Sequence, residues 1–149
     1  MFEAVPASVT KINFTNKTED RELFNILYYL YYYNGGGVAT GDINNDGLPD
    51  IYFTANSKGG NKLFLNKGNF VFEDITANAG VAGTADWSSG VTMADVNGDG
   101  FLDIYVTASS QHHNLQGANE LFLNNKNGSF TPSAEKFGLN FSGMGTQAA

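Results

Sequence analysis

A segment of roughly 50–60 residues occurs twice in this sequence, and it restricts the folds that the chain can adopt. A repeat of this length is one supersecondary unit, which buries its apolar face by stacking against the next copy. The second copy is the longer one because of the loop at residues 110–117. The matching segments are residues 37–42 and 90–95, 50–55 and 103–108, 61–66 and 119–124, and 70–81 and 129–139.

Each repeat contains four short segments with the composition of β-strands. In the first copy, the first segment is glycine-rich and covers residues 35–41. The next two are short apolar runs, rich in β-branched and aromatic residues, and the fourth covers residues 70–76 after a turn at residues 67–69. Four short antiparallel strands at this period are typical of a β-propeller blade. We therefore predict an all-β fold built from four-stranded antiparallel blades.

The most distinctive part of each repeat is a loop with the pattern D-x-N-x-D-G-x-x-D, at residues 42–50 and 95–103. Calcium takes six to eight oxygen ligands, and alternate oxygen donors can converge on one ion if the backbone coils around it. The glycine in the sixth position suits this turn, because glycine adopts left-handed angles at little cost. The predicted ligands are Asp42, Asn44, Asp46, the Leu48 carbonyl and Asp50 in one loop, and Asp95, Asn97, Asp99, the Phe101 carbonyl and Asp103 in the other.

Two other interpretations of these loops are weaker. Asn-Asp-Gly and Gly-Asp-Gly form good hairpin turns without a metal, but a turn needs only the glycine and one Asp. Three carboxylates in one loop repel each other and raise their pKa values unless a cation is present. An EF-hand would need a bidentate Glu in position 12, where this chain has Phe53 and Val106. We therefore predict two Ca²⁺ sites.

The composition fits a turn-rich β-protein and excludes several other classes. The chain has 149 residues, of which 15% are charged, with 18 glycines and no cysteine. These values suit one domain and exclude disulfides and thiolate metal sites. The net charge is −7 and there is no basic stripe, so we expect no nucleic-acid partner. No apolar run is long enough to span a membrane, and residues 1–4 do not begin a signal peptide.

The loops and the strands after them resemble one family of repeats. After the first loop come Asp-Ile-Tyr-Phe-Thr-Ala at residues 50–55 and Leu-Phe-Leu-Asn at residues 63–66, and both recur in the second copy. With the loops, they resemble the FG-GAP or VCBS repeats of integrin α-type propellers, over residues 35–139. Residues 33–39 also resemble secreted bacterial members of that family.

The resemblance implies a seven-bladed, extracellular, calcium-stabilised scaffold for binding or adhesion. We accordingly predict a non-enzymatic, calcium-binding module, extracellular or at the cell surface, for adhesion or assembly. The alternative is a glycan-binding or substrate-binding propeller domain of a longer secreted enzyme. The chain departs from the family in length, because it contains only two full calcium blades.

The repeat boundaries divide the chain into four parts. Residues 145–149 match residues 90–94, the first strand of the preceding blade. A closed propeller needs about four to eight blades. We therefore expect completion by further blades of the same protein, or by other copies joined head to tail into a ring or fibre. The predicted parts are N-terminal strands that complete a blade (1–34), two blades with calcium loops (35–88 and 89–142), and the first strand of a further blade (143–149).

The N-terminal region has no counterpart in the repeat. Residues 11–16 alternate as a half-buried strand does, and residues 25–33 are an apolar and aromatic run of high β-propensity. This run either packs between blades as part of the core or forms an aromatic platform for a glycan or protein ligand.

Other candidate residues carry weaker signals. His112 and His113 lie in the long loop and fit a solvated segment better than a transition-metal site. Trp87 either fills a gap between blades or lies at a ligand surface. Ser88 and Ser89 have no His-Asp partner that the sequence indicates, so nothing supports a hydrolase.

Overall fold

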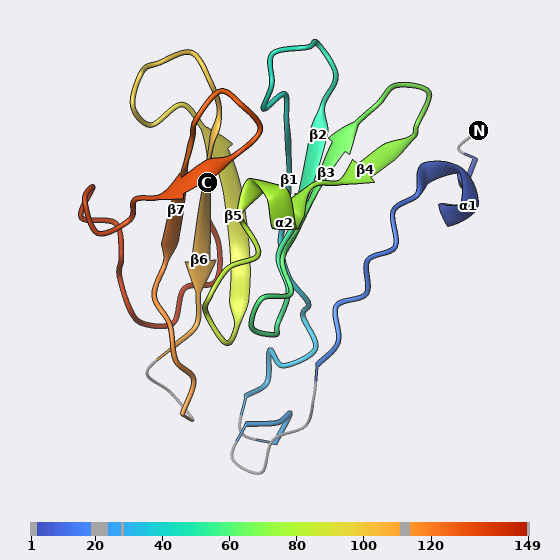
Figure 1. The fold of residues 1–149 in the computed structure, drawn as a ribbon. Helices are drawn as coiled ribbons and strands as arrows, with labels where there is room; N and C mark the ends of the chain where they lie inside the picture. The colour runs from blue at the N-terminus through green and yellow to red at the C-terminus, as the bar shows by residue number, and fades with distance from the viewer. Residues whose placement is uncertain (1–2, 19–23, 28, 111–113, 149) are drawn as a thin grey trace.

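The computed structural model describes residues 3–18, 24–27, 29–110 and 114–148. It contains two four-stranded sheets with strand orders β1-β2-β3-β4 and β5-β6-β7-β8, here called the first and second blade (Figure 1). All neighbouring strands within a sheet are antiparallel. The strands are β1 (Val38–Gly41), β2 (Asp50–Phe53), β3 (Lys62–Asn66), β4 (Phe72–Asp74), β5 (Ser88–Ala94), β6 (Asp103–Ala108), β7 (Glu120–Asn124) and β8 (Phe130–Pro132).

Each sheet corresponds to one sequence repeat, which confirms the predicted four-stranded blades. Equivalent residues have equivalent partners, since Tyr52 pairs with Leu63 in the first blade and Tyr105 pairs with Leu121 in the second. The β-branched and aromatic residues of the middle strands suit a pleated, covered surface. The first and fourth strands of the first blade are shorter than predicted, and the two sheets do not close into a ring.

The main hydrophobic core lies between the two blades. Successive residues of a strand point to opposite faces of a sheet. The face of the first blade that carries Tyr52 packs against the face of the second that carries Ile104 and Val106. We call the face that carries Tyr52 the leading face of the first blade, and the face that carries Ile104 and Val106 the trailing face of the second. Tyr105 is the equivalent of Tyr52, so it belongs to the leading face of the second blade. The other buried residues of this core are Ile43, Leu63, Ala79, Val81, Val91, Phe122 and Phe130.

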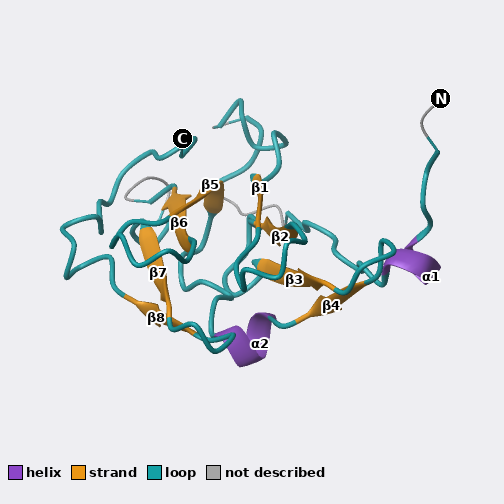
Figure 2. Cartoon of the chain, turned by 90° about the horizontal axis from the view of Figure 1, so that it is seen from above, coloured by secondary structure: helices purple, strands orange, loops and turns teal. Residues whose placement is uncertain are grey.

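The blades fan out from their inner strands. Strands β1 and β5 lie close together, whereas β4 and β8 diverge, with the short helix α2 (Thr76–Ala79) near the outer edges (Figure 2). The inner strands approach so closely that a Cβ on Gly37 would lie 2.8 Å from the carbonyl oxygen of Ser89. Small residues are therefore required in the inner strands, which is the arrangement of neighbouring propeller blades.

The predicted strand over residues 11–16 is wrong, because residues 3–18 contain no strand and only the short helix α1 (Ala7–Thr10). Side chains attach this segment to the first blade instead. The ring of Phe14 stacks on Phe53 of the trailing face, with centroids 4.8 Å apart. The amide of Asn16 donates to Asn56 Oδ1 at 2.6 Å and accepts from the Asn56 backbone N–H at 2.8 Å.

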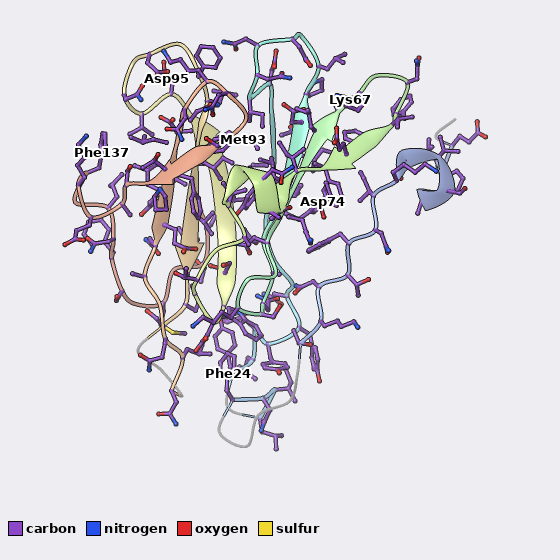
Figure 3. The ribbon with its side chains drawn as sticks, in the orientation of Figure 1. Phe24, Lys67, Asp74, Met93, Asp95 and Phe137 are labelled. Carbon is purple, nitrogen blue, oxygen red and sulfur yellow. The ribbon has the colours of Figure 1, made fainter. Side chains whose placement is uncertain are left out.

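The strand expected from residues 25–33 is also wrong over the described part of that run. Its backbone forms turns, in which the N–H of Tyr29 donates to the Asn25 carbonyl at 2.9 Å and that of Tyr32 to the Tyr29 carbonyl at 3.0 Å. A second buried cluster consists of Phe24, Tyr32, Trp87 and Leu115. Figure 3 shows Phe24 at the end of the molecule opposite Asp95. Aromatic packing has therefore overridden the β-propensity of the run.

The predicted first strand of a further blade, over residues 143–149, is not formed in the described residues. Residues 143–148 make one isolated bridge, between Ser109 and Met144. The Ser89 hydroxyl donates to the Gly145 carbonyl at 2.6 Å, and the segment passes close to Gly90. It thus lies beside β5 as β5 lies beside β1. Across the described ranges, no helix is long and apolar enough to cross a membrane.

Candidate metal sites in the two acidic loops

The two acidic loops join β1 to β2 and β5 to β6, and both lie at the same end of the molecule (Figure 1). In the first loop, the Asp42 carboxylate accepts hydrogen bonds from the backbone N–H of Asp46 at 3.0 Å and of Gly47 at 2.7 Å. Asp46 Oδ1 accepts from the N–H of Leu48 at 2.9 Å. Gly47 has a φ of +85°, which explains the glycine in this position. These bonds coil the backbone around the acidic side chains.

The second loop repeats this pattern. The Asp95 carboxylate accepts from the N–H of Asp99 at 3.0 Å and of Gly100 at 2.8 Å, and Asp99 Oδ1 accepts from the N–H of Phe101 at 3.0 Å. The backbone donors, Gly100 foremost, hold the pKa of Asp95 below its ordinary value. The two loops therefore share these internal hydrogen bonds, as their shared sequence pattern predicts. The second loop has one more, from the N–H of Gly98 to Asp95 Oδ1 at 2.8 Å.

Asp50 and Asp103, in the ninth position, are completely buried and close each loop from behind. Asp50 Oδ2 accepts from the N–H of Ile43 at 3.0 Å, and its Oδ1 accepts from the N–H of Asn66, at the end of β3, at 2.7 Å. Asp103 makes the same two bonds to the equivalent N–H groups at 3.0 and 2.8 Å. Each of these carboxylates thus joins its loop to the third strand of its own blade.

The carboxylates of the first loop lie near enough to repel each other. Burial raises the pKa of Asp50, and the charges of Asp46 and Asp42 raise it further, against the opposing effect of its two backbone donors. A cation between these groups would relieve both the repulsion and the cost of burying a charge.

The donors of each loop fit calcium in chemistry and in number, with three carboxylates, one amide oxygen and one backbone carbonyl. Within the described ranges, however, no group of three or more His, Cys, Asp or Glu side chains is gathered as metal ligands are. The Asn44 amide nitrogen lies 2.9 Å from Asp46 Oδ2, and that of Asn97 lies 3.2 Å from Asp99 Oδ2. An ion bound in the loops would replace these hydrogen bonds.

Two asparagines join the loops to each other. Asn45 Nδ2 of the first loop donates to the Gly100 carbonyl of the second at 3.1 Å. Asn124, at the end of β7, donates through Nδ2 to the Ile43 carbonyl of the first loop at 2.7 Å and to the Leu102 carbonyl of the second at 3.1 Å. Sequence reasoning did not single out Asn124, although the recurrence of Leu-Phe-Leu-Asn in both repeats was the signal that could have found it.

The weaker candidates Trp87, Ser88 and Ser89 are held by packing or hydrogen bonds within the fold. Trp87 is buried in the aromatic cluster, so it fills space between elements. The Ser88 hydroxyl lies 3.3 Å from the Asn61 amide nitrogen, and the Ser89 hydroxyl bonds a backbone carbonyl. His112 and His113 lie outside the described residues.

A groove of about 630 Å³ opens beside the inner strands, away from the loops. Its lining includes Tyr29, Tyr31, Trp87 and the glycines at residues 35–37. Tyr31 and the neighbouring Tyr33 are 61% and 63% exposed. These tyrosines are the only part of the 25–33 run that fits the predicted aromatic platform, among the residues that the structure describes.

Comparison with known proteins agrees with this architecture. The model of the FG-GAP-like repeat matches residues 42–106, from the first loop to the middle strand of the second blade. Cartilage acidic protein 1 of Xenopus tropicalis is 41% identical over 98 residues, which are 65% of this chain and 14% of that protein. The protein of the same name from Mus musculus is 39% identical over 92 residues, or 62% of this chain and 13% of that protein.

The chain therefore spans about one seventh of the length of these relatives. The family match covers β2 to β5, both acidic loops and the start of β6. Over residues 42–106, this chain is similar to the FG-GAP-like repeat.

Proposed function

We propose that this chain is a non-enzymatic, calcium-binding part of an extracellular β-propeller, in which calcium stabilises the blades and the blade faces serve assembly or adhesion. The observation that carries this proposal is the pair of acidic loops that share a set of internal hydrogen bonds, each closed by a buried Asp. Asp42, Asn44, Asp46, Asp50 and the Leu48 carbonyl would hold one ion. Their counterparts from Asp95 to Asp103 would hold the other.

Calcium in these loops would be structural. It would supply positive charge to carboxylates that repel each other, and it would bind the folded loop far more tightly than the unfolded chain. A ligand of the native state stabilises it by RT ln(1 + [Ca²⁺]/Kd), which is about 2.7 kcal/mol for each site at a hundredfold excess over Kd.

Thermal unfolding with millimolar calcium and with excess chelator tests this proposal. We expect Asp46→Ala and Asp99→Ala each to remove part of the calcium-dependent increase in Tm, because each removes a ligand from one loop. The matched control is Glu73→Ala, which removes an exposed carboxylate of β4 whose Oε2 lies 3.6 Å from Lys67 Nζ. An equal calcium effect in the native sequence and in both loop variants would overturn the proposal.

The leading face of the second blade supports a role in assembly. The first blade has its leading face covered by the second, whereas on the second blade Val96 is 39% exposed. Near the other end of that blade, Phe141 and Met144 are 62% and 47% exposed. The internal repeat indicates the occupant, namely the trailing face of another blade of the same kind. Sedimentation velocity with calcium and with chelator tests whether a second copy supplies that blade. A larger species that dissociates on chelation would support self-assembly, and a monomer would leave further blades of a longer chain as the source.

Two further observations support an extracellular, non-catalytic role. The relatives are named as acidic proteins of cartilage, and this chain has a net charge of −7. The serines that a hydrolase could use are bonded within the blade framework. Assays of the chain against ester and glycoside substrates should accordingly give no turnover.

Glycan binding is a second candidate, favoured by the exposed Tyr31 and Tyr33 beside the glycine-lined groove. A tyrosine ring has an apolar face and a polar hydroxyl in contact with water, so it can pack against the apolar face of a sugar. Binding on a glycan array that is lost in Tyr31→Ala would support this function. Binding that persists in the variant would show that the tyrosines are not the site.

A further inference from the structure

A lysine side chain lies against the second acidic loop. Lys126 Nζ lies 3.4 Å from Asp99 Oδ2 and donates to the Asp99 carbonyl at 3.3 Å. It also lies over the Phe101 ring, 5.1 Å from the centroid. Asp99 and the Phe101 carbonyl both belong to the predicted calcium ligands of this loop. The ammonium group therefore already partly neutralises a carboxylate that the ion would need.

The first loop has no such lysine, because the equivalent position is glycine. The N–H of Lys126 donates to Asn124 Oδ1 at 2.8 Å, just as the N–H of Gly68 donates to Asn66 Oδ1 at 2.9 Å. Both residues have left-handed backbone angles, with φ of 64° and 81°. The backbone therefore has the same conformation at this position, where the second hairpin carries a cationic side chain and the first carries none.

The nearest lysine of the first blade does not replace it. Lys67 Nζ points to Glu73 Oε2 at 3.6 Å, along the outer strands. Figure 3 shows Lys67 on the hairpin between β3 and β4. Lys67 thus offers a control with the same charge in the neighbouring position of the other blade.

We propose that Lys126 is an internal counter-ion of the second loop, which weakens calcium binding there and makes the first loop fill before the second. This inference rests on the proposed calcium function of both loops. The ammonium and the ion compete for Asp99, and the single positive charge repels the double one at short range. Lys126 also reduces the charge repulsion in the second loop when no ion is bound, so that blade depends less on calcium for its stability.

The test is a calcium titration of the full chain by ¹⁵N–¹H NMR, which follows each loop separately. The Gly47 and Gly100 amides donate to Asp42 and Asp95, so each resonance reports on its own loop. In the native sequence we expect the Gly47 resonance to reach its midpoint at a lower calcium concentration than the Gly100 resonance. Identical midpoints would overturn the proposed order of filling.

Substitution of the lysine should remove the difference. Lys126→Gly introduces the residue of the first hairpin, and Lys126→Gln removes the charge and keeps a polar side chain that is one atom shorter. In both variants we expect the Gly100 midpoint to fall by about three- to tenfold, and the effect to shrink as salt screens the charge. The Gly47 midpoint should not change. An unchanged Gly100 midpoint in both variants would overturn the inference.

Two controls separate the charge from other effects. Lys126→Arg keeps a positive charge, so it should leave the Gly100 midpoint high, and Lys67→Gln removes a lysine that does not touch either loop, so both midpoints should stay as they are. Tightening in Lys126→Arg, or in Lys67→Gln, would contradict the role given to the Lys126 charge. If calcium moves neither glycine resonance in the native sequence, the calcium function itself fails, which is a different result from an unchanged midpoint in the variants.

Discussion

The two blades carry equivalent tyrosines on their leading faces, but they enclose them differently. Tyr52 is completely buried, whereas Tyr105 is half-buried. Both hydroxyls donate to the segment that follows the fourth strand of their own blade, at 2.6 Å to the Val81 carbonyl and at 3.2 Å to the Leu139 carbonyl. The connections within each blade are thus the same, and the difference comes from the second blade, which covers the first.

The second position of the acidic loops gives the same contrast. Ile43 is 3% exposed and belongs to the core between the blades, whereas the equivalent Val96 is 39% exposed. This comparison teaches that a blade fixes its own strands and loop by itself, but that its leading face reaches full burial only against a neighbour. Stability in this chain should therefore be unevenly divided between equivalent positions.

The largest expected effect is on the tyrosines. Tyr52→Ala should lower the free energy of unfolding by about 3–5 kcal/mol, because it leaves a cavity in the core and removes a buried hydrogen bond. Tyr105→Ala should cost roughly half as much, since less apolar surface is buried there. Urea unfolding at one saturating calcium concentration measures both. Equal costs would break the comparison, because they would mean that Tyr105 is enclosed by another blade in solution.

A smaller difference is expected between two asparagines at the ends of the third strands. Asn66 donates to the Pro49 carbonyl of its own loop at 2.9 Å, whereas Asn124 also reaches back to the Ile43 carbonyl of the first blade at 2.7 Å. Asn124→Ala should therefore cost more stability than Asn66→Ala, by about 1–3 kcal/mol, because it leaves a buried carbonyl without its donor.

The same urea experiment measures the asparagine pair. Asn66→Ala serves as the matched control, since it removes the hydrogen bond within the blade but none between blades. If the two variants cost the same, the hydrogen bond to Ile43 contributes nothing to the contact between the blades.

The repeats and the loops could be predicted from sequence because their signals are local. Four apolar runs with turns at a fixed period indicate a blade, and the positions of Asp42, Asp46 and Gly47 indicate a coiled acidic loop without any knowledge of distant contacts. The hydrogen bonds that both loops share confirm that this local pattern determines the backbone. Whether the loops bind calcium stays a prediction.

The N-terminal region could not be predicted because its structure depends on partners far along the chain. Phe14 packs on Phe53, and Tyr32 on Trp87, so the local alternation and the high β-propensity of these segments had no influence on the outcome. The cross-blade role of Asn124 was hidden for the same reason. Its partner Ile43 lies 81 residues away.

The smallest effect concerns Asp74, where the outer strands of the two blades differ. Asp74 lies opposite Phe64, and the equivalent position opposite Phe122 is Pro132. The Asp74 carboxylate accepts from Lys62 Nζ at 2.9 Å and from the N–H of Thr76 at 3.0 Å. Burial alone would raise the pKa of Asp74, but the hydrogen bonds from Thr76 and Lys62 outweigh it and hold the pKa below the ordinary value of 3.8.

A folded-state pKa below that of the unfolded chain means that the ionised Asp74 stabilises the fold above pH 3.8, and that this contribution is lost as the pH falls through the folded-state value. Asp74→Asn should therefore cost about 0.5–1 kcal/mol at pH 7, an exposed ion pair's usual contribution, and the cost should decline below pH 3.8 and disappear below the folded-state pKa. Unfolding in excess chelator, with Glu73→Gln as the control on the same strand, isolates this effect from the loops. A cost that persists at low pH would mean that Asp74 acts through the shape of its side chain, and that the outer strands of the two blades do not differ in charge dependence.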